Sequence, residues 1–449
     1  MSRYYIETWG CQMNVHDSEK LAGTLDSLGF TKASREEEAD LLLLNTCAVR
    51  EQAAEKVFSK LGRLGRLKQS RPEILIGVTG CVASMEGEKI FRRAPHVDFV
   101  LGPRGLMNLP LLLQAARARR RAIDIVHHQE SVLYPWQRIE RGEGPPHAYL
   151  TVIEGCNKGC TFCIVPRTRG REASRRLEDV IREVRSLAEN GYTEVEFLGQ
   201  TVNAYRDPQG RALSDLLRAA DSVEGIRRIR FTTSHPLHMT RGLMRAMAEL
   251  PRVVRRLHLP VQSGSDAVLA RMRRGYTRRG YLDRVRDLRS FVPDISFSTD
   301  IIVGFPGETQ EDFRKTLELL EEVRFDTVYS FLYSPRPGTP AAECPDDGVS
   351  LEEKAERLER LQLRQAEIQI EGNRAWIGRE VEVLVEGTAK LGGGCVTGRT
   401  IHGQIVNFPS GECRRGDLAR VLIEHAAAHS LKGRFLHIGG PSARLGLAG

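Results

Sequence analysis

Three cysteines in one short loop are the residues of this sequence best suited to chemistry. Cys156, Cys160 and Cys163 have a C-x3-C-x2-C spacing inside the segment GCNKGCTFCIVPRTRG. Thiolates are soft ligands that favour iron–sulfur clusters or zinc, and a structural zinc would need a fourth ligand close by. The next histidine or cysteine along the chain is His235, far from the loop. The spacing therefore predicts a four-iron cluster with three protein ligands, whose remaining iron is open to a small chelating cofactor.

A second set of three cysteines is spread over the beginning of the chain. Cys11, Cys47 and Cys81 each lie at or just after the end of an expected β-strand. Because the carboxyl ends of parallel strands form the ligand crevice of an open sheet, these thiols can converge on one site. Taken alone, the same pattern also fits buried cysteines that only fill a core. The remaining cysteines match no ligand position and are expected to be spare thiols: Cys344, Cys395 and Cys413.

We expect alternating strands and helices to position the dispersed thiols of Cys11, Cys47 and Cys81. The strands are Arg3–Thr8, Leu41–Asn45, Ile74–Thr79 and Val97–Leu101, and the helices between them include Asp17–Leu28 and Glu51–Lys68. This alternation predicts a mainly parallel sheet with helices on its faces. A polar linker that contains prolines follows at His127–Pro146.

Six further strand–helix units carry the tight cysteine loop after their first strand and predict a barrel or partial barrel. Their strands are Tyr149–Glu154, Glu194–Gly199, Arg228–Ser234, Arg256–Val261, Ser296–Val303 and Thr327–Tyr333. One charged amphipathic helix is expected over Ser350–Trp376. The short runs that follow are broken by glycine and predict a small β-barrel: Glu380–Glu386, Cys395–Thr400, Gln404–Phe408 and Asp417–Glu424. The expected fold class is α/β, with an N-terminal parallel-sheet domain over residues 1–125, a central partial (β/α)6 barrel over 142–374 and a small C-terminal β-barrel over 377–440.

Composition limits the class of protein. Of 449 residues, 41% are hydrophobic and 28% are charged, which excludes a largely disordered chain. No apolar run approaches the roughly 20 residues of a membrane helix, and the start MSRYYIETWG has no signal-peptide pattern. Nine cysteines are too few for a disulfide scaffold, so we expect the protein to function in the reducing cytoplasm. A net charge of +8 suits a polyanionic partner.

The tight cysteine loop resembles the signature of the radical S-adenosylmethionine (SAM) superfamily. This resemblance implies that SAM chelates the open iron and that one electron cleaves it to a 5′-deoxyadenosyl radical. Phe162, just before the last cysteine, matches the position that packs on the adenine of SAM. The resemblance also implies a set of candidate residues for the SAM pocket or its rim: Gln200, Asn203, Ser234, Gln262, Arg273 and Asp300. Each of these residues could instead be a capping or turn residue.

The order of the three domains resembles the methylthiotransferase family. The supporting motifs are CQMNVHDSE, NTCAVREQAAEK, CNKGCTFCIVPRTRGREASR, LGQTVNAY, FTTSHP, LHLPVQSGSD, DIIVGFPGET and RPGTPAA. In that family the dispersed cysteines bind a second four-iron cluster whose free iron carries the sulfur to be inserted, and the C-terminal domain is an RNA-binding TRAM module. All six cysteines are therefore expected to be metal ligands and catalytic. Arg167 departs from the family, which more often has an aromatic residue there.

The stretches AVRE and TRGRE favour one branch of this family. That branch converts N(6)-dimethylallyladenosine (isopentenyladenosine) next to the anticodon of tRNA to its 2-methylthio derivative. The implied partners are the tRNA anticodon stem-loop, an electron donor such as flavodoxin or ferredoxin, and a sulfur donor. The alternatives are the same chemistry on threonylcarbamoyl-adenosine or on a ribosomal protein side chain, a non-catalytic iron–sulfur RNA-binding protein, and a SAM enzyme with a single cluster.

Arginines are concentrated after the cysteine loop and again in Arg271–Arg289, where eight occur. Arginine binds phosphate in a bidentate manner and stacks on bases. We expect these two runs to hold the tRNA backbone, whereas the alternative for the second run is a helix surface offset by nearby acids.

Overall fold

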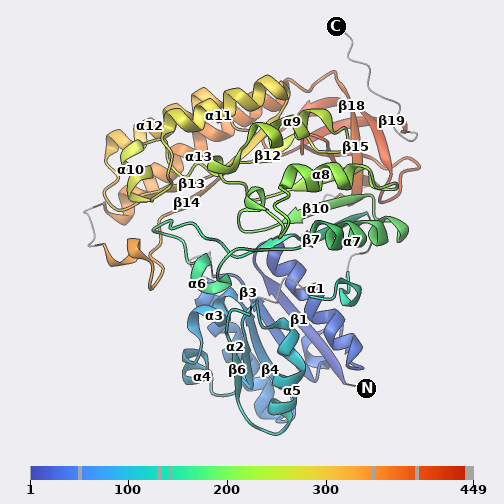
Figure 1. The fold of residues 1–449 in the computed structure, drawn as a ribbon, viewed down its shortest axis with the longest axis vertical. Coiled ribbons are helices and arrows are strands. Elements are labelled where there is room, and N and C mark those ends of the chain that lie inside the picture. The colour runs from blue at the N-terminus through green and yellow to red at the C-terminus, as the bar shows by residue number, and fades with distance from the viewer. Residues whose placement is uncertain are drawn as a thin grey trace.

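The computed structural model describes residues 2–48, 53–128, 134–141, 144, 146–344, 349–389 and 394–439. Figure 1 shows the N-terminal domain below, the central barrel with its helices above it, and the C-terminal β-barrel at the upper right. The first residues of the helix expected at Glu51, part of the linker and of the AVRE stretch, and the tail after Gly439 lie outside the described residues.

The N-terminal domain is a six-stranded parallel sheet in the order β2-β1-β3-β4-β5-β6. The strands are β1 Arg3–Trp9, β2 Thr31–Lys32, β3 Leu41–Thr46, β4 Leu75–Gly80, β5 Phe99–Leu101 and β6 Ala122–Asp124. The helices are α1 Gln12–Ser27, α2 Ala53–Ser70, α3 Cys81–Glu86, α4 Lys89–Arg93 and α5 Leu109–Arg117. Strand β3 is buried throughout because its alternate side chains serve two cores. Leu42 and Leu44 join one core and Leu41 and Leu43 the other.

The central domain is a partial barrel of six parallel strands in two sheets, β11-β10-β7 and β12-β13-β14. Its strands are β7 His147–Thr151, β10 Glu194–Leu198, β11 Arg228–Phe231, β12 Arg256–His258, β13 Ser296–Val303 and β14 Thr327–Leu332. Between the two sheets, the bridge of Ile229 to Val253 joins β11 to the segment before β12. A short antiparallel pair precedes and follows the cysteine loop: β8 Ile153–Glu154 and β9 Ala173–Ser174.

Helices cover the outside of this barrel, as the alternation predicted, except for α6 Val165–Arg169, which lies against α3 of the N-terminal domain (Figure 1). The covering helices are α7 Leu177–Glu189, α8 Leu213–Asp221, α9 Arg241–Glu249, α10 Asp266–Arg271, α11 Arg278–Phe291, α12 Gln310–Val323 and α13 Leu351–Arg374. Short 3-10 turns lie at Glu36–Glu38, Leu106–Asn108, Trp136–Arg138, Val202–Ala204, Pro236–His238 and Pro340–Glu343. Within the described residues, no helix is both long enough and apolar enough to span a membrane.

The C-terminal domain is a closed barrel in the order β15-β16-β17-β19-β18. Its strands are β15 Glu380–Thr388, β16 Cys395–Thr400, β17 Ile405–Pro409, β18 Leu418–Ala426 and β19 Leu431–Ile438. It packs against the N-terminal ends of the central strands, where Arg228 donates to the Arg399 carbonyl at 2.6 Å and Arg256 donates to the Gly403 carbonyl at 3.1 Å. The expected α/β fold class with a parallel-sheet domain, a partial barrel and a small β-barrel is thus confirmed.

Candidate active site

The loop between β8 and α6 brings the tight cysteine trio together. The Arg274 guanidinium lies 3.3 Å from the Sγ atom of Cys160, and the Thr201 hydroxyl lies 3.5 Å from that of Cys156. Burial, with a smaller contribution from negative charge on Cys160 and Cys156, raises the pKa of the Cys163 thiol to about 12. A thiolate at Cys163 therefore needs a positive partner such as a metal centre to form at neutral pH.

The three thiols line a cavity of about 580 Å³ at the C-terminal ends of the barrel strands. A volume of this size is typical of cofactor sites. Five of the predicted SAM-pocket residues also line the cavity: Phe162, Gln200, Ser234, Gln262 and Asp300. Asn203 and Arg273 do not line it.

Several of the cavity residues are held in ways that suit a polar ligand. Gln200 accepts a hydrogen bond from the Gly155 amide and so braces the start of the cysteine loop. The Ser234 hydroxyl is buried, and no hydrogen-bond partner for it exists among the described residues. Gln262 has a φ of 75°, a conformation that non-glycine residues adopt mainly where function or packing requires it. An unpartnered hydroxyl in a large cavity is free to bind a ligand.

Asn203 has a positioning role instead. Its side-chain amide donates to the His235 carbonyl at 2.9 Å and accepts from the His235 amide at 2.8 Å. This pair of bonds fixes the loop after β11, which carries Ser234 into the cavity.

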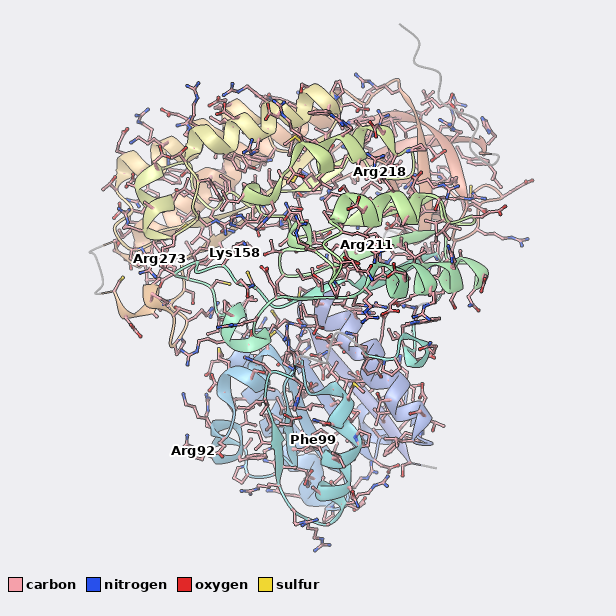
Figure 2. The ribbon with its side chains drawn as sticks, in the orientation of Figure 1. Arg92, Phe99, Lys158, Arg211, Arg218 and Arg273 are labelled. Carbon is pink, nitrogen blue, oxygen red and sulfur yellow. The ribbon has the colours of Figure 1, made fainter. Side chains whose placement is uncertain are left out.

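Arg274, one residue beyond the predicted Arg273, lines the cavity, as does Arg336. Arg274 is 6% exposed and also donates to the Tyr276 hydroxyl and the Pro260 carbonyl, both at 3.0 Å. Arg273 has a φ of 54°, so the chain reverses direction there after α10. In the view of Figure 2, Arg273 and Lys158 lie along the lower left side of the barrel. The sequence analysis included Arg274 in the run Arg271–Arg289, but as a candidate RNA contact and not as a cavity residue.

The dispersed trio also converges, at the ends of β1, β3 and β4. Cys11 is the N-cap of α1, Cys47 directly follows β3, and Cys81 begins α3. A hydrogen bond with the Cys47 thiol, with help from the Arg169 guanidinium and against the effect of burial, lowers the pKa of Cys11 to about 6. Gly10 permits this approach, because a Cβ atom there would lie 2.9 Å from the Cys47 Cβ.

Arg169 connects the dispersed trio to the central barrel. It lies at the end of α6, it is buried, and its Nη2 donates to Asp17 of the N-terminal domain at 2.6 Å. Its charge interacts with the thiols of Cys81 and Cys11, and its Nη1 has no hydrogen-bond partner among the described residues. Since α6 has five residues and rises about 1.5 Å per residue, it spans roughly 8 Å. Cys163 of the tight trio lies two residues before α6, and Arg169 at the other end of α6 interacts with the dispersed trio, so the two trios lie near opposite ends of one short helix.

Both trios fit an anionic iron–sulfur cluster by their donor chemistry. Each supplies three thiols beside a buried guanidinium. The Nη1 of Arg169 has no hydrogen-bond acceptor among the described residues, so it can donate to a bound cluster. Among the described residues, no three His, Cys, Asp or Glu side chains are arranged as ligands of a single metal ion.

Most of the predicted arginine runs are engaged within the protein. Arg278 pairs with Glu318 at 3.1 Å, and Arg286 pairs with Asp283 at 2.6 Å. Arg167, where the chain departs from the family pattern, donates to the Gly338 carbonyl. Within the run Arg271–Arg289, Arg273 is the one arginine that has no partner among the described residues. These contacts fit the helix-surface alternative for most of this run, and contact with the tRNA backbone stays a prediction.

Comparison with known families matches each domain of the chain. Residues 3–102 match the Uncharacterized protein family UPF0004, residues 150–320 the Radical SAM superfamily, and residues 374–436 the TRAM domain. The tRNA-2-methylthio-N(6)-dimethylallyladenosine synthase of Aeromonas salmonicida is 47% identical over 97% of this chain and 92% of that protein. This chain belongs to the tRNA-2-methylthio-N(6)-dimethylallyladenosine synthase family. Proteins of the same name from Methylococcus capsulatus and Stutzerimonas stutzeri are 47% and 48% identical over 97% of the chain, covering 96% and 99% of their own lengths.

Solved structures share the fold of this family member at low sequence identity. The radical SAM methyltransferase TsrM from Kitasatospora setae, solved with cobalamin and a four-iron, four-sulfur cluster, has a TM-score of 0.56 and 16% identity, covering 76% of this chain and 74% of that one. The cobalamin-dependent radical SAM enzyme OxsB has a TM-score of 0.53 and 13% identity, covering 81% of this chain and 56% of that one. These likenesses concern the fold alone.

Proposed function

We propose that this protein is the radical SAM enzyme that converts N(6)-dimethylallyladenosine next to the anticodon of tRNA to its 2-methylthio derivative. The observation that carries the proposal is the pair of cysteine trios beside α6, each with its own buried arginine. Relatives that are 47–48% identical along nearly the whole chain are named for this reaction. The proposed domain limits are 1–125, 142–374 and 377–440. Because the proposed substrate is tRNA, we also propose that the enzyme functions in the cytoplasm.

Two four-iron clusters are assigned to the two trios, with SAM in the cavity of about 580 Å³. Cys156, Cys160 and Cys163 would hold the cluster that supplies an electron to SAM and so generates a radical able to remove a hydrogen from an unactivated C–H bond. Cys11, Cys47 and Cys81 would hold the second cluster. An external electron donor of the flavodoxin or ferredoxin type and an external sulfur donor complete the reaction.

The chain's own residues bind, orient and shield the reacting groups. Phe162, which makes an edge-on contact with Phe305, offers an apolar surface to an adenine ring in the cavity. Ser234 and Gln262 supply polar atoms, and Asp300 lies 3.5 Å from His258 at the cavity wall. Buried ion pairs hold the N-terminal domain against the barrel, with Lys20 lying 3.6 Å from Glu154. The fixed domains keep the two trios in one relative position.

The proposal is tested with anaerobically reconstituted protein, reductant, SAM and a dimethylallylated anticodon stem-loop RNA. We expect 5′-deoxyadenosine by chromatography and the 2-methylthio nucleoside by mass spectrometry. The matched control is the same RNA without the dimethylallyl group. Product only on threonylcarbamoyl-adenosine RNA, or on no RNA at all, would contradict the assignment.

A further inference from the structure

Two large aromatic side chains on strand β14 stand out by their exposure. Tyr329 and Phe331 are each 47% exposed, and both belong to the last strand of the sheet β12-β13-β14. Residues two apart on a strand point to the same face, so the two rings form one row. The ring of His258 packs edge-on against Tyr329, with the centroids 5.8 Å apart. Both rings are therefore accessible to a ligand, and the contact with His258 holds the Tyr329 ring in one orientation.

This row connects two cavities. Tyr329 lines a cavity of about 170 Å³ at the seam between the central barrel, α13 and the C-terminal barrel. Phe331 and Tyr333 line the cavity that contains the three thiols of the tight loop. At about 3.3 Å per residue, the strand carries the row over roughly 13 Å from Tyr329 to Tyr333.

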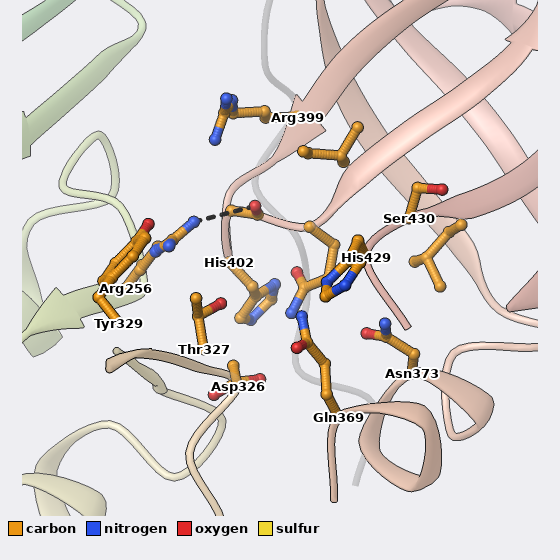
Figure 3. Close-up of a pocket in the computed structure, with 14 residues that line it drawn as sticks. Arg256, Asp326, Thr327, Tyr329, Gln369, Asn373, Arg399, His402, His429 and Ser430 are labelled. Carbon is orange, nitrogen blue, oxygen red and sulfur yellow. Dashed lines mark hydrogen bonds between the residues drawn. The ribbon is translucent and has the colours of Figure 1, made fainter. Parts of the chain in front are cut away.

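The seam cavity is lined by Arg256, Arg399 and His402, of which Arg399 pairs with Glu386 at 2.9 Å and His402 with Asp294 at 3.0 Å. Figure 3 shows Arg256 beside Tyr329, with Arg399 and His402 on the facing C-terminal barrel. The acid in the cavity wall, Asp326, accepts hydrogen bonds from the Phe297 amide and the Ser296 hydroxyl, which directs it toward the protein. Guanidinium groups beside exposed aromatic faces are the combination that binds unpaired nucleotides, through phosphate contacts and base stacking.

We infer that Tyr329 and Phe331 form a stacking row on which unpaired bases of the substrate RNA lie between the C-terminal barrel and the thiol cavity. This inference rests on the proposed function, because it assigns the RNA to the same reaction. The row explains how one RNA contacts a β-barrel at the N-terminal ends of the strands and a reaction centre at their C-terminal ends.

Leucine substitutions test the row, because leucine keeps apolar bulk and removes the ring. Binding of a fluorescent anticodon stem-loop RNA to the reconstituted protein is measured by anisotropy at several salt concentrations. Loss of one stacked base corresponds to roughly tenfold weaker binding. We expect this loss in Tyr329→Leu and in Phe331→Leu with an unchanged salt slope, and recovery in Tyr329→Phe. Arg399→Gln should instead reduce the salt slope by about one.

Two controls make the result specific. Leu363→Ala changes an apolar side chain on α13 that is 61% exposed and should leave RNA affinity unchanged. SAM binding should be unchanged in Tyr329→Leu, Arg399→Gln and Leu363→Ala, because none of these three residues lines the thiol cavity. Unchanged RNA affinity in both leucine variants, or equal losses in Leu363→Ala, would overturn the stacking row. Failure of the wild type to form a methylthio product would refute the proposed function, while the RNA affinities would still decide the row.

Discussion

Each cysteine trio lies beside its own buried arginine, but the positive charges of the two arginines are compensated differently. Arg169, beside the dispersed trio, forms an ion pair with Asp17 at 2.6 Å. Arg274, beside the tight trio, donates to Cys160, a hydroxyl and a carbonyl, and no carboxylate pairs with it in the described part of the chain. A cation and hydrogen bonds beside a cluster favour its reduced form. On the proposed assignment of one cluster to each trio, we therefore expect the cluster at the tight trio to be reduced more readily.

Removing one thiol from each trio should break the comparison most completely. Cys160→Ala is expected to abolish SAM cleavage, whereas Cys47→Ala should retain cleavage and lose sulfur insertion. The measurements are 5′-deoxyadenosine by chromatography and the methylthio nucleoside by mass spectrometry. Cys344→Ala, at an exposed thiol outside both trios, is the control. Normal methylthio formation by the Cys47 variant would show that the trios do not divide the work.

The ion pair of Asp17 and Arg169 should be the next largest contribution. Asp17→Asn leaves a buried guanidinium without its carboxylate, which costs about 3–5 kcal/mol of unfolding free energy. Denaturant unfolding of the reconstituted protein measures this loss. Asp283→Asn removes the partner of the exposed Arg286 and should cost at most about 1 kcal/mol. Equal effects of the two variants would mean that the buried pair has no special role.

Two glycines sharpen the comparison at the backbone. A Cβ at Gly10 would lie 2.4 Å from the Asn14 Oδ1, whereas a Cβ at Gly159 would meet no atom within 4 Å. Gly10→Ala should therefore destabilise the dispersed trio by about 1–3 kcal/mol and reduce its iron content. Gly159→Ala should change stability by at most about 0.5 kcal/mol. The ranking would be wrong if Gly159→Ala lost more iron than Gly10→Ala.

The smallest expected effect concerns the reduction potential of the tight cluster. Arg274→Gln removes a positive charge and weakens the hydrogen bond to Cys160. We expect the potential to fall by about 60 mV, which is a tenfold change in the one-electron equilibrium. Redox titration followed by electron paramagnetic resonance measures the shift, and Arg274→Lys should show a smaller one. An unchanged potential in Arg274→Gln would contradict the role given to this side chain.

The sequence predicted the elements whose local pattern is strong. The run Leu41–Leu44 predicted a strand, which the structure buries on both faces. The spacing in the tight loop predicted a cluster site, whereas the ligand role of the dispersed trio was implied by the family resemblance and stays a prediction. Strand β19 was not predicted, because Gly433 interrupts its pattern. The folded barrel explains this glycine, since a Cβ there would lie 2.5 Å from the Leu422 carbonyl oxygen.

Contacts between distant segments could not be predicted in the same way. Arg169 and Asp17 are 152 residues apart in sequence, and only the packing of the two domains brings them together. The exchange of Arg273 for Arg274 in the cavity depends on one backbone reversal, the φ of 54° at Arg273. A helical or turn pattern does not encode that angle when the residue is not glycine.

Counting iron and sulfide in anaerobically reconstituted protein tests most directly that each trio holds its own cluster. The wild type should contain about eight irons per chain, and Cys→Ala replacement of either complete trio should leave about four. The variant without Cys156, Cys160 and Cys163 should lose SAM cleavage, and the variant without Cys11, Cys47 and Cys81 should retain it. About four irons in the wild type, or loss of all iron when either trio is replaced, would contradict two independent clusters.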